Sequence, residues 1–284
     1  MIQNYFLSFK IYKFFFAFIL AFLITSCSNN LPKSENSYAY ITNQKGKIQV
    51  LSLSDLSIVN EIDVGRGARG LGITDDGSTL VVAVRSSGDL VLVDTKNFQI
   101  IKRIPIGENP EFVRIRDNKA YVSFEPAAIG GPPPKPGSKE ADDLQKKREE
   151  NNEQPARVAI VDLMLGEKVS EIQGGMETEG IEFSFDHSKI IVTNEADENL
   201  SVHDISTGKL VKKIDTSNYG NRPRGIKRSP NGDFYIATIE YGNRLVKVNN
   251  EFEIVNDVET GLVPYGIAFS SDGEFILVAL SGGQ

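Results

Sequence analysis

The chain has 284 residues, 38 of them acidic and 31 basic, and its net charge of −7 makes nucleic acid an unexpected partner. A single cysteine excludes an intramolecular disulfide, and two histidines exclude a histidine-rich zinc centre. The hydrophobic content of 40% is typical of a globular protein.

The first 26 residues have the pattern of a signal peptide. Lys10 and Lys13 precede an apolar run, Phe14–Ile24, which is short for a membrane span but suits a signal-peptide core. The segment ends in Ile24-Thr25-Ser26-Cys27, which resembles the bacterial lipobox, where the cysteine is lipidated and becomes the mature N-terminus. A short membrane helix that ends in a cysteine is the alternative.

The lipobox resemblance implies an exported bacterial lipoprotein, held to a membrane by a lipid on Cys27. By the same resemblance, Ser28 implies sorting to the periplasmic face of the outer membrane. Residues 27–37 would form a lipidated tether for a domain at residues 38–284. The expected partners are the membrane, through the lipid, and a periplasmic protein or a small polar ligand.

Residues 180–225 contain one complete unit of a pattern that repeats along this domain. Four runs of 5 residues, rich in β-branched side chains and separated by turn formers, predict four short strands. These are Ile181–Phe185, Lys189–Thr193, Leu200–Asp204 and Leu210–Ile214. One such sheet cannot bury both of its faces, so its recurrence predicts a stacked array.

The first turn of the unit locates the other copies. It recurs as Asp76-Gly77, Asp117-Asn118, Asp186-His187, Asn231-Gly232 and Asp272-Gly273. The intervals are 41, 69, 45 and 41 residues, and the long one holds an insertion at residues 126–156. Without the insertion, a period of about 40–45 residues with four strands is the signature of propeller blades.

The predicted fold is therefore all-β, a β-propeller of four-stranded antiparallel blades with about five blades and part of a sixth. The first blade has three strands, Tyr38–Thr42, Lys47–Leu51 and Ile58–Val64. The next four run Leu71–Ile106, Phe112–Ile172, Ile181–Ile214 and Ile226–Val258, and residues 267–280 give two strands of a sixth. Because these strands do not complete the first blade, we expect the chain to be a fragment of a longer ring.

Three further features are predicted to be structural. Asp94, Asp162 and Asp204 end third strands, with Asn249 at the equivalent place, and are expected to cap the following turns. Glycines begin the inner strands, where close packing leaves little room for side chains: Gly70, Gly180, Gly225 and Gly266. In the insertion, the charged stretch Asp142–Glu153 is a candidate for a short helix, but a mobile flap or disordered loop above the ligand face is the favoured interpretation.

Connectivity predicts which end of the propeller carries a ligand. In a four-stranded meander, the turns between strands 1 and 2 and between strands 3 and 4 lie at one end, and the other loops at the opposite end. Strand 1 lines the channel, so the residues just before it lie nearest the axis: Arg69, Glu111, Glu179, Arg224 and Tyr265. Such a mouth is a candidate site for a polar ligand. The alternative is a rim of charges that only pair with one another or meet solvent.

Several segments resemble YVTN-type propeller repeats, a group that includes lactonase-like propellers, surface-layer repeats and relatives of the cytochrome d1 haem domain. They are Ala39-Tyr40-Ile41-Thr42-Asn43, Ile191-Val192-Thr193-Asn194, and Leu200–Asp204 followed by Ser206-Thr207-Gly208-Lys209. More closely, residues 177–184, residues 221–230 and the insertion after Phe124-Glu125-Pro126 resemble propellers associated with quinone-dependent alcohol catabolism. The resemblance spans about residues 38–280 and implies a ring of seven blades.

The cofactors of this group do not suit these residues. The chain has no Cys-x-x-Cys-His for covalent haem and no tryptophan on which a PQQ cofactor would stack. His187, in a strand 1–2 turn, and His203, in a third strand, are not expected to ligate haem. No cofactor and no metal is predicted.

Three functions remain open from the sequence. We favour a binding module for a ligand or a partner, with an accessory role in periplasmic quinone-dependent alcohol oxidation implied by the resemblance. A lactone hydrolase would use oxygens of Glu111, Glu179, Asn194 and Glu240 to hold calcium or water, and Arg69 and Arg224 to stabilise an oxyanion. A structural surface propeller is the third. Enzymatic activity is not favoured, and no catalytic residue is assigned.

Overall fold

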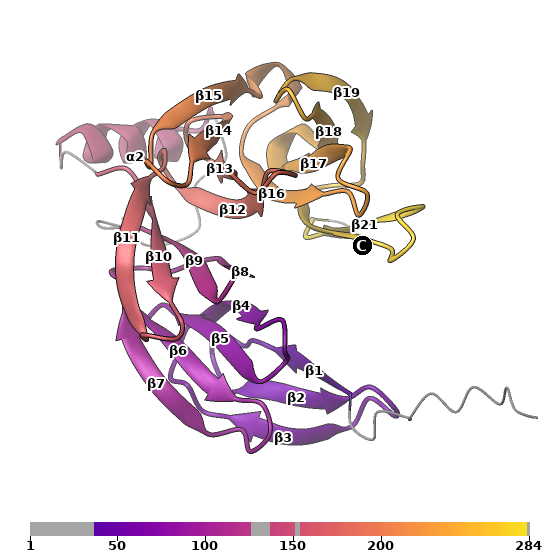
Figure 1. Cartoon of the computed structure of the whole chain (residues 1–284). Helices are drawn as coiled ribbons and strands as arrows, with labels where there is room; N and C mark the ends of the chain where they lie inside the picture. The colour runs from indigo at the N-terminus through magenta and orange to yellow at the C-terminus, as the bar shows by residue number, and fades with distance from the viewer. Residues whose placement is uncertain (1–36, 126–136, 151–153, 283–284) are drawn as a thin grey trace, which may run out of the picture.

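The computed structural model describes residues 37–125, 137–150 and 154–282. Cys27, the signal peptide and most of the tether lie outside these residues, as does part of the insertion. Six antiparallel sheets follow one another in chain order around an arc, with the first and last sheets at its two ends (Figure 1). The predicted all-β architecture of four-stranded antiparallel blades is confirmed.

Each sheet is a meander in which every strand pairs with its neighbour in the sequence. The first sheet contains β1 (Tyr38–Ile41), β2 (Ile48–Ser52) and β3 (Ile58–Ile62). The second contains β4 (Ala68–Ile73), β5 (Thr79–Val84), β6 (Asp89–Asp94) and β7 (Ile100–Pro105). The third contains β8 (Val113–Arg116), β9 (Lys119–Phe124), β10 (Arg157–Asp162) and β11 (Glu167–Gln173).

The remaining sheets repeat this arrangement. The fourth contains β12 (Thr178–Phe183), β13 (Lys189–Asn194), β14 (Asn199–Asp204) and β15 (Leu210–Asp215). The fifth contains β16 (Pro223–Arg228), β17 (Phe234–Ile239), β18 (Arg244–Asn249) and β19 (Ile254–Glu259), and the sixth β20 (Pro264–Phe269) and β21 (Ile276–Leu280). Two short 3-10 helices, η1 (Ser217–Tyr219) and η2 (Glu240–Gly242), follow β15 and β17.

The hydrophobic core lies between successive sheets. Strand β5 is apolar on both faces because a sheet packs against each of them. Val81 and Ala83 belong to the cluster shared with the third sheet, whereas the alternate residues Leu80 and Val82 belong to the cluster shared with the first. This stacking holds the inner strands of neighbouring sheets side by side around the axis.

The charged stretch of the insertion forms a helix, which was the less favoured of the two interpretations that the sequence left open. Helix α2 (Lys139–Glu150) consists largely of strong helix formers. The Ser138 hydroxyl accepts a hydrogen bond of 3.2 Å from the amide of Ala141, and Glu140 and Asp142 lie in the first turn, where the helix dipole favours acidic side chains. In the described parts of the chain, no helix combines the length and apolarity that a bilayer crossing requires.

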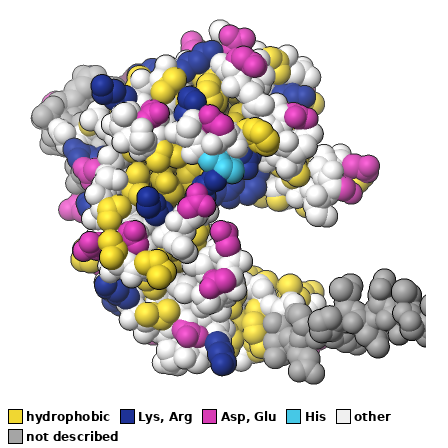
Figure 2. Space-filling view, viewed as in Figure 1, with side chains coloured by type: hydrophobic (Ala, Val, Ile, Leu, Met, Phe, Trp, Pro, Cys, Tyr) yellow, Lys and Arg dark blue, Asp and Glu magenta, His cyan; other side chains and the backbone are white. Residues whose placement is uncertain are grey.

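Charged side chains of both signs are interspersed on the face seen in Figure 2. His187 lies at the turn between β12 and β13 and interacts there with Arg116. That turn is at the predicted hairpin end, away from the candidate mouth.

Candidate functional site

The chain enters each inner strand through a residue in the left-handed backbone region, which non-glycine residues rarely adopt. The five equivalent residues are Gly67 (φ 78°), Asn109 (48°), Glu177 (53°), Arg222 (63°) and Val263 (58°). Two residues further on stand the predicted mouth residues, Arg69, Glu111, Glu179, Arg224 and Tyr265. One local conformation, repeated five times, therefore presents all five side chains at the same end.

The pairing of the inner strands is irregular at these positions. In the fourth sheet, Thr178 pairs with Asn194, and the regular ladder resumes only at Ile181. The same irregularity occurs at the starts of β4, β16 and β20. The residues skipped by the ladder include Glu179 and Gly180 in the fourth sheet, and such bulges redirect side chains at functional sites.

Hydroxyl groups fix the backbone of the mouth. Thr193 Oγ1 accepts a hydrogen bond of 2.7 Å from the amide of Gly180 and donates one of 2.6 Å to the carbonyl of Arg224 on the next inner strand. Thr238 makes the equivalent bonds to the amide of Gly225 and the carbonyl of Tyr265, at 2.7 and 3.0 Å. The carbonyls of two mouth residues are thus held by the preceding sheet.

A second ring of mouth residues follows the second strands. These are Arg85, Glu125, Glu195 and Glu240, sixteen residues after the first-ring residue of their own sheet except in the third, where the interval is fourteen. Their backbones are held by the loop that enters the inner strand; for example, the amide of Glu195 donates to the carbonyl of Glu177 at 2.9 Å. Each of these four sheets therefore contributes two side chains to the mouth.

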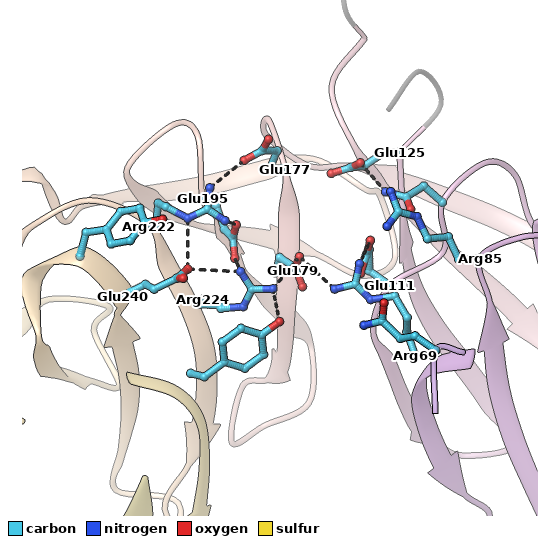
Figure 3. A pocket seen from close by; sticks show the side chains of 14 residues that line it. Arg69, Arg85, Glu111, Glu125, Glu177, Glu179, Glu195, Arg222, Arg224 and Glu240 are labelled. Carbon is cyan, nitrogen blue, oxygen red and sulfur yellow. Dashed lines mark hydrogen bonds and ion pairs between the residues drawn. The ribbon is translucent and has the colours of Figure 1, made fainter. Parts of the chain in front are cut away.

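Together the two rings line a cavity of about 320 Å³ (Figure 3). The lining contains six glutamates, four arginines and four other polar or aromatic residues. They are Glu111, Glu125, Glu177, Glu179, Glu195, Glu240, Arg69, Arg85, Arg222, Arg224, Gln44, Asn109, Tyr241 and Tyr265.

Two arginines and two glutamates form a buried cluster in one half of the cavity (Figure 3). Arg222 pairs with Glu195 and lies 3.1 Å from Glu240. Arg224 lies 2.6 Å from Glu195 and 3.2 Å from Glu240, so both carboxylates bridge both guanidinium groups. The side chains of Glu195 and both arginines are at most 10% exposed.

Tyrosine rings cover the outer faces of this cluster. The Arg224 guanidinium lies 3.8 Å from the centroid of the Tyr265 ring and also bonds the Tyr265 hydroxyl. The Arg222 guanidinium lies 5.7 Å from the Tyr241 ring. Both tyrosine faces are therefore already occupied by cations from the chain itself.

The other half of the cavity is built around Arg69 and Glu111, which form an ion pair. Glu179 joins the halves, because its Oε1 lies 3.8 Å from Arg69 and 3.3 Å from Arg224. Asn109 donates a hydrogen bond of 2.6 Å to Glu125 beside this pair.

Burial and crowding of carboxylates raise the pKa of two mouth glutamates. Burial, reinforced by Glu179, raises the pKa of Glu111 to about 8 despite its pairing with Arg69. Burial and Glu179 also raise the pKa of Glu195 well above its usual range, against the opposing effect of Arg224. Burial tends to lower the pKa of Arg224, but the surrounding glutamates raise it overall. The cavity therefore holds more carboxylates than its arginines neutralise.

Six of the seven predicted site residues line this cavity, and Asn194 does not. Asn194 is 1% exposed and accepts hydrogen bonds from the amide of Gly175 and the hydroxyl of Thr178, at 2.9 and 2.8 Å. It lines a separate cavity of about 380 Å³ together with His203, whose Nε2 bonds Ser201 at 2.9 Å. Its role is to connect strands rather than to face the mouth.

Glu195 and Arg222, the centre of the buried cluster, are among the residues that connectivity places at the loop-rich end, but the sequence did not assign them to the channel mouth. The sixteen-residue interval from Glu179 to Glu195, which Arg224 and Glu240 repeat, is a signal that would have identified Glu195. Within the described ranges, no three histidine, cysteine or acidic side chains converge as a metal site. At the mouth, the glutamates pair with the arginines that lie between them, so their carboxylates do not converge on one point.

Solved structures with the same fold are similar to this chain. A functionally unknown protein from Desulfotomaculum acetoxidans DSM 771 is 19% identical, with a TM-score of 0.69 over 86% of this chain and 73% of that one. Hydrazine synthase from Kuenenia stuttgartiensis is 18% identical, with a TM-score of 0.52 over 86% of this chain and 89% of that one. A chain of the mitotic checkpoint complex is 11% identical, with a TM-score of 0.64 over 83% of this chain and 65% of that one.

These similarities establish a β-propeller fold. At such low identity they show the fold alone. No protein-family model matches the sequence, and no curated protein does.

Proposed function

We propose that this chain is a binding module that takes a small polar ligand into the cavity at its mouth. The observation that carries the proposal is the buried cluster of Arg222, Arg224, Glu195 and Glu240 beneath an open, polar cavity of about 320 Å³. Buried charges are costly to assemble unless they are paired in a fixed geometry. If the charged side chains of the mouth only contacted solvent, there would be no reason for these four to be buried.

The rigidity of the surrounding backbone supports the same function. Binding sites lose less affinity to conformational ordering when their groups are preorganised. The carbonyls of Arg224 and Tyr265 are fixed by Thr193 and Thr238, and their side chains meet at the floor of the cavity.

The experiment is a thermal-shift screen of the full chain with small amines, polyols, carboxylates, lactones and calcium. The Glu179→Ala/Arg224→Ala variant removes one charge of each sign from the mouth. The matched control, Arg114→Ala/Glu182→Ala, removes an ion pair of similar burial between the inner strands of the third and fourth sheets, outside the mouth. A ligand at about 100 times its dissociation constant stabilises a protein by about 2.7 kcal/mol.

A compound that stabilises the parent and the control, but not the mouth variant, supports the proposal. If no class of compound stabilises the parent, or if the mouth variant responds as the parent does, the proposal is wrong. In that case a protein partner or a structural role becomes the better explanation.

The resemblance to YVTN repeats adds a cellular context to this proposal. On that basis the module is anchored in the outer membrane through Cys27 and assists periplasmic quinone-dependent alcohol oxidation. Metabolic labelling with a radioactive fatty acid should mark the parent and not a Cys27→Ser variant. Labelling of neither protein, or of both, would contradict the lipid anchor.

A lactone hydrolase is less well supported by the geometry. Arg69 and Arg224, its proposed oxyanion donors, are both paired with carboxylates. Asn194, one of its proposed oxygen ligands, lies in another cavity. The lactones in the screen test this alternative directly, because turnover would release acid.

A further inference from the structure

We infer that the ligand of the mouth carries a primary ammonium group, which binds in the cavity at Glu111. This inference rests on the proposed function and adds the chemical class of the ligand. It follows from three features of the cavity: an excess of negative charge, a buried carboxylate oxygen without a partner, and tyrosine faces that are already covered.

The excess of negative charge is visible in the lining itself. When all ten groups are ionised, the six glutamates and four arginines give the lining a net charge of −2. This excess develops as pH rises through the raised pKa of Glu111, about 8. A ligand with a negative charge would increase this imbalance, whereas a cation reduces it. The cavity is therefore matched to a positively charged molecule.

The carboxylate of Glu111 has the buried oxygen that lacks a partner. Its side chain is 3% exposed, and although Oε1 pairs with Arg69, Oε2 has no hydrogen-bond partner. The Oδ1 atom of Asn109, two residues away, is also buried without a partner. Unsatisfied buried acceptors are rare in folded proteins, and two on one loop indicate a place for a donor.

The same imbalance exists on a smaller scale at Glu195. Its Oε1 lies 2.6 Å from Arg224 but is not aligned for a hydrogen bond. Because two arginines already surround Glu195, its neighbourhood is closer to neutrality than that of Glu111. Glu111, with a single paired arginine, is the better position for the ligand cation.

A primary amine fits better than the other cations. A divalent metal needs several converging oxygens, and no such group exists among the described residues. A quaternary ammonium is recognised by several aromatic faces, but the two tyrosines of the lining, Tyr265 and Tyr241, each already have an arginine over one face, Arg224 and Arg222. A primary ammonium has three donors and needs acceptors, which Glu111 and Asn109 provide.

Binding should depend on pH, because a proton and the ammonium compete for Glu111. The groups that act on Glu111 are Arg69 from β4, Glu179 from β12, Glu125 after β9 and Arg85 after β5, and its pKa is raised to about 8. A primary amine remains charged at pH 7 to 9. Its affinity should therefore fall about tenfold from pH 9 to pH 7 as Glu111 gains its proton.

The test compares four small hydroxyl compounds that differ in their second group: ethanolamine with a primary ammonium, choline with a quaternary ammonium, ethane-1,2-diol with a neutral hydroxyl, and glycolate with a carboxylate. Each is titrated calorimetrically into the full chain at constant ionic strength, with calcium chloride as a fifth titrant. The variant is Glu111→Gln, which keeps shape but removes the charge. The matched control is Glu182→Gln, because Glu182 is also a buried glutamate paired with an arginine, Arg114, and lies outside the cavity.

We expect ethanolamine to bind more tightly than the other four titrants. Its dissociation constant should rise about tenfold or more in Glu111→Gln and change little in Glu182→Gln. Circular dichroism checks that both variants are folded. Equal weakening in both variants would overturn the assignment to Glu111, as would ethanolamine binding that is independent of pH.

The inference and the proposed function fail in different ways. If choline, the diol, glycolate or calcium binds the mouth and ethanolamine does not, the amine inference is wrong and the binding function stands. If none of these compounds binds, and none in the wider screen does, both are wrong.

Discussion

Gly180→Ala should destabilise the protein, whereas the same substitution at the equivalent Gly266 should not. A Cβ at Gly180 would lie 2.5 Å from the carbonyl oxygen of Arg224, 3.1 Å from Thr193 Oγ1 and 3.2 Å from the amide nitrogen of Ile226. A Cβ at Gly266 meets nothing within 4 Å. The two glycines occupy the same place in the repeat, so Gly266→Ala is an internal control.

The magnitude follows from the 2.5 Å contact. Real Cβ contacts are essentially never shorter than 3.0 Å, so β12 and β16 must separate by about 0.5 Å at this point. Overpacking of this kind costs about 1–3 kcal/mol. Movement of the Arg224 carbonyl also weakens its bond from Thr193, worth about 1 kcal/mol. Against this, replacing either glycine by alanine restricts the unfolded chain and so stabilises the folded state by about 0.4–1 kcal/mol.

The net effect of Gly180→Ala is therefore a loss of about 2 kcal/mol in the free energy of unfolding. At about 2–4 °C per kcal/mol, its melting temperature should fall by about 4–8 °C, while Gly266→Ala should melt at or slightly above the parent. Far-UV circular dichroism at a fixed scan rate measures both. If the two variants melt together, close packing of the inner strands does not limit stability, and the reasoning fails.

Three further predictions concern single side chains. The melting temperature should decline from pH 5 to pH 9. The folded-state pKa of Glu111 is raised to about 8, so the stability that its proton confers is lost as pH rises through that value. The Glu111→Gln variant should show a smaller decline. Thr193→Val should cost about 1–3 kcal/mol by leaving the amide of Gly180 and the carbonyl of Arg224 unpaired, and Thr193→Ser should recover most of it in urea denaturation. Asp162→Ala should lower the free energy of unfolding by about 1 kcal/mol, because it removes the hydrogen bonds of 2.9 and 3.0 Å that the Asp162 carboxylate accepts from the following turn. Asp162→Asn keeps an acceptor oxygen there, so an equal loss in both variants would show that the cap is unimportant.

The fold could be predicted because it depends on local patterns that the sequence displays. Runs rich in β-branched residues and the turns between them predicted the strands. The inner strand of the fourth sheet was predicted to begin at Ile181 but begins at Thr178, because its pairing with the next strand is interrupted between these two residues. The capping role of Asp204 was predicted from its place at a strand end, and its carboxylate accepts from the amide of Thr207 at 2.9 Å. The helix α2 was considered but not favoured, because the insertion was judged by its charge rather than by its helix propensity.

The site was predicted in its first ring and missed at its centre. Asn194 and Glu195 are adjacent and were both placed at the loop-rich end, but only Asn194 was taken as a ligand-binding residue, and side chains alternate across a strand. No sequence pattern states which of several nearby arginines a carboxylate will pair with. That pairing depends on side chains from different sheets, such as Arg222 and Glu195, which only the folded arrangement brings together.

The ion-pair network has one weak connection, and it lies where a ligand would act. Glu179 joins the two halves of the mouth through a single oxygen, 3.3 Å from Arg224 but 3.8 Å from Arg69. A cation bound at Glu111 Oε2 brings a second positive charge to the carboxylate whose Oε1 pairs with Arg69, and Arg69 also lies near the carboxylate of Glu179. The half of the mouth around Arg69 can therefore rearrange on binding, while the cluster of Arg222, Arg224 and Glu195 remains fixed by its shared carboxylates.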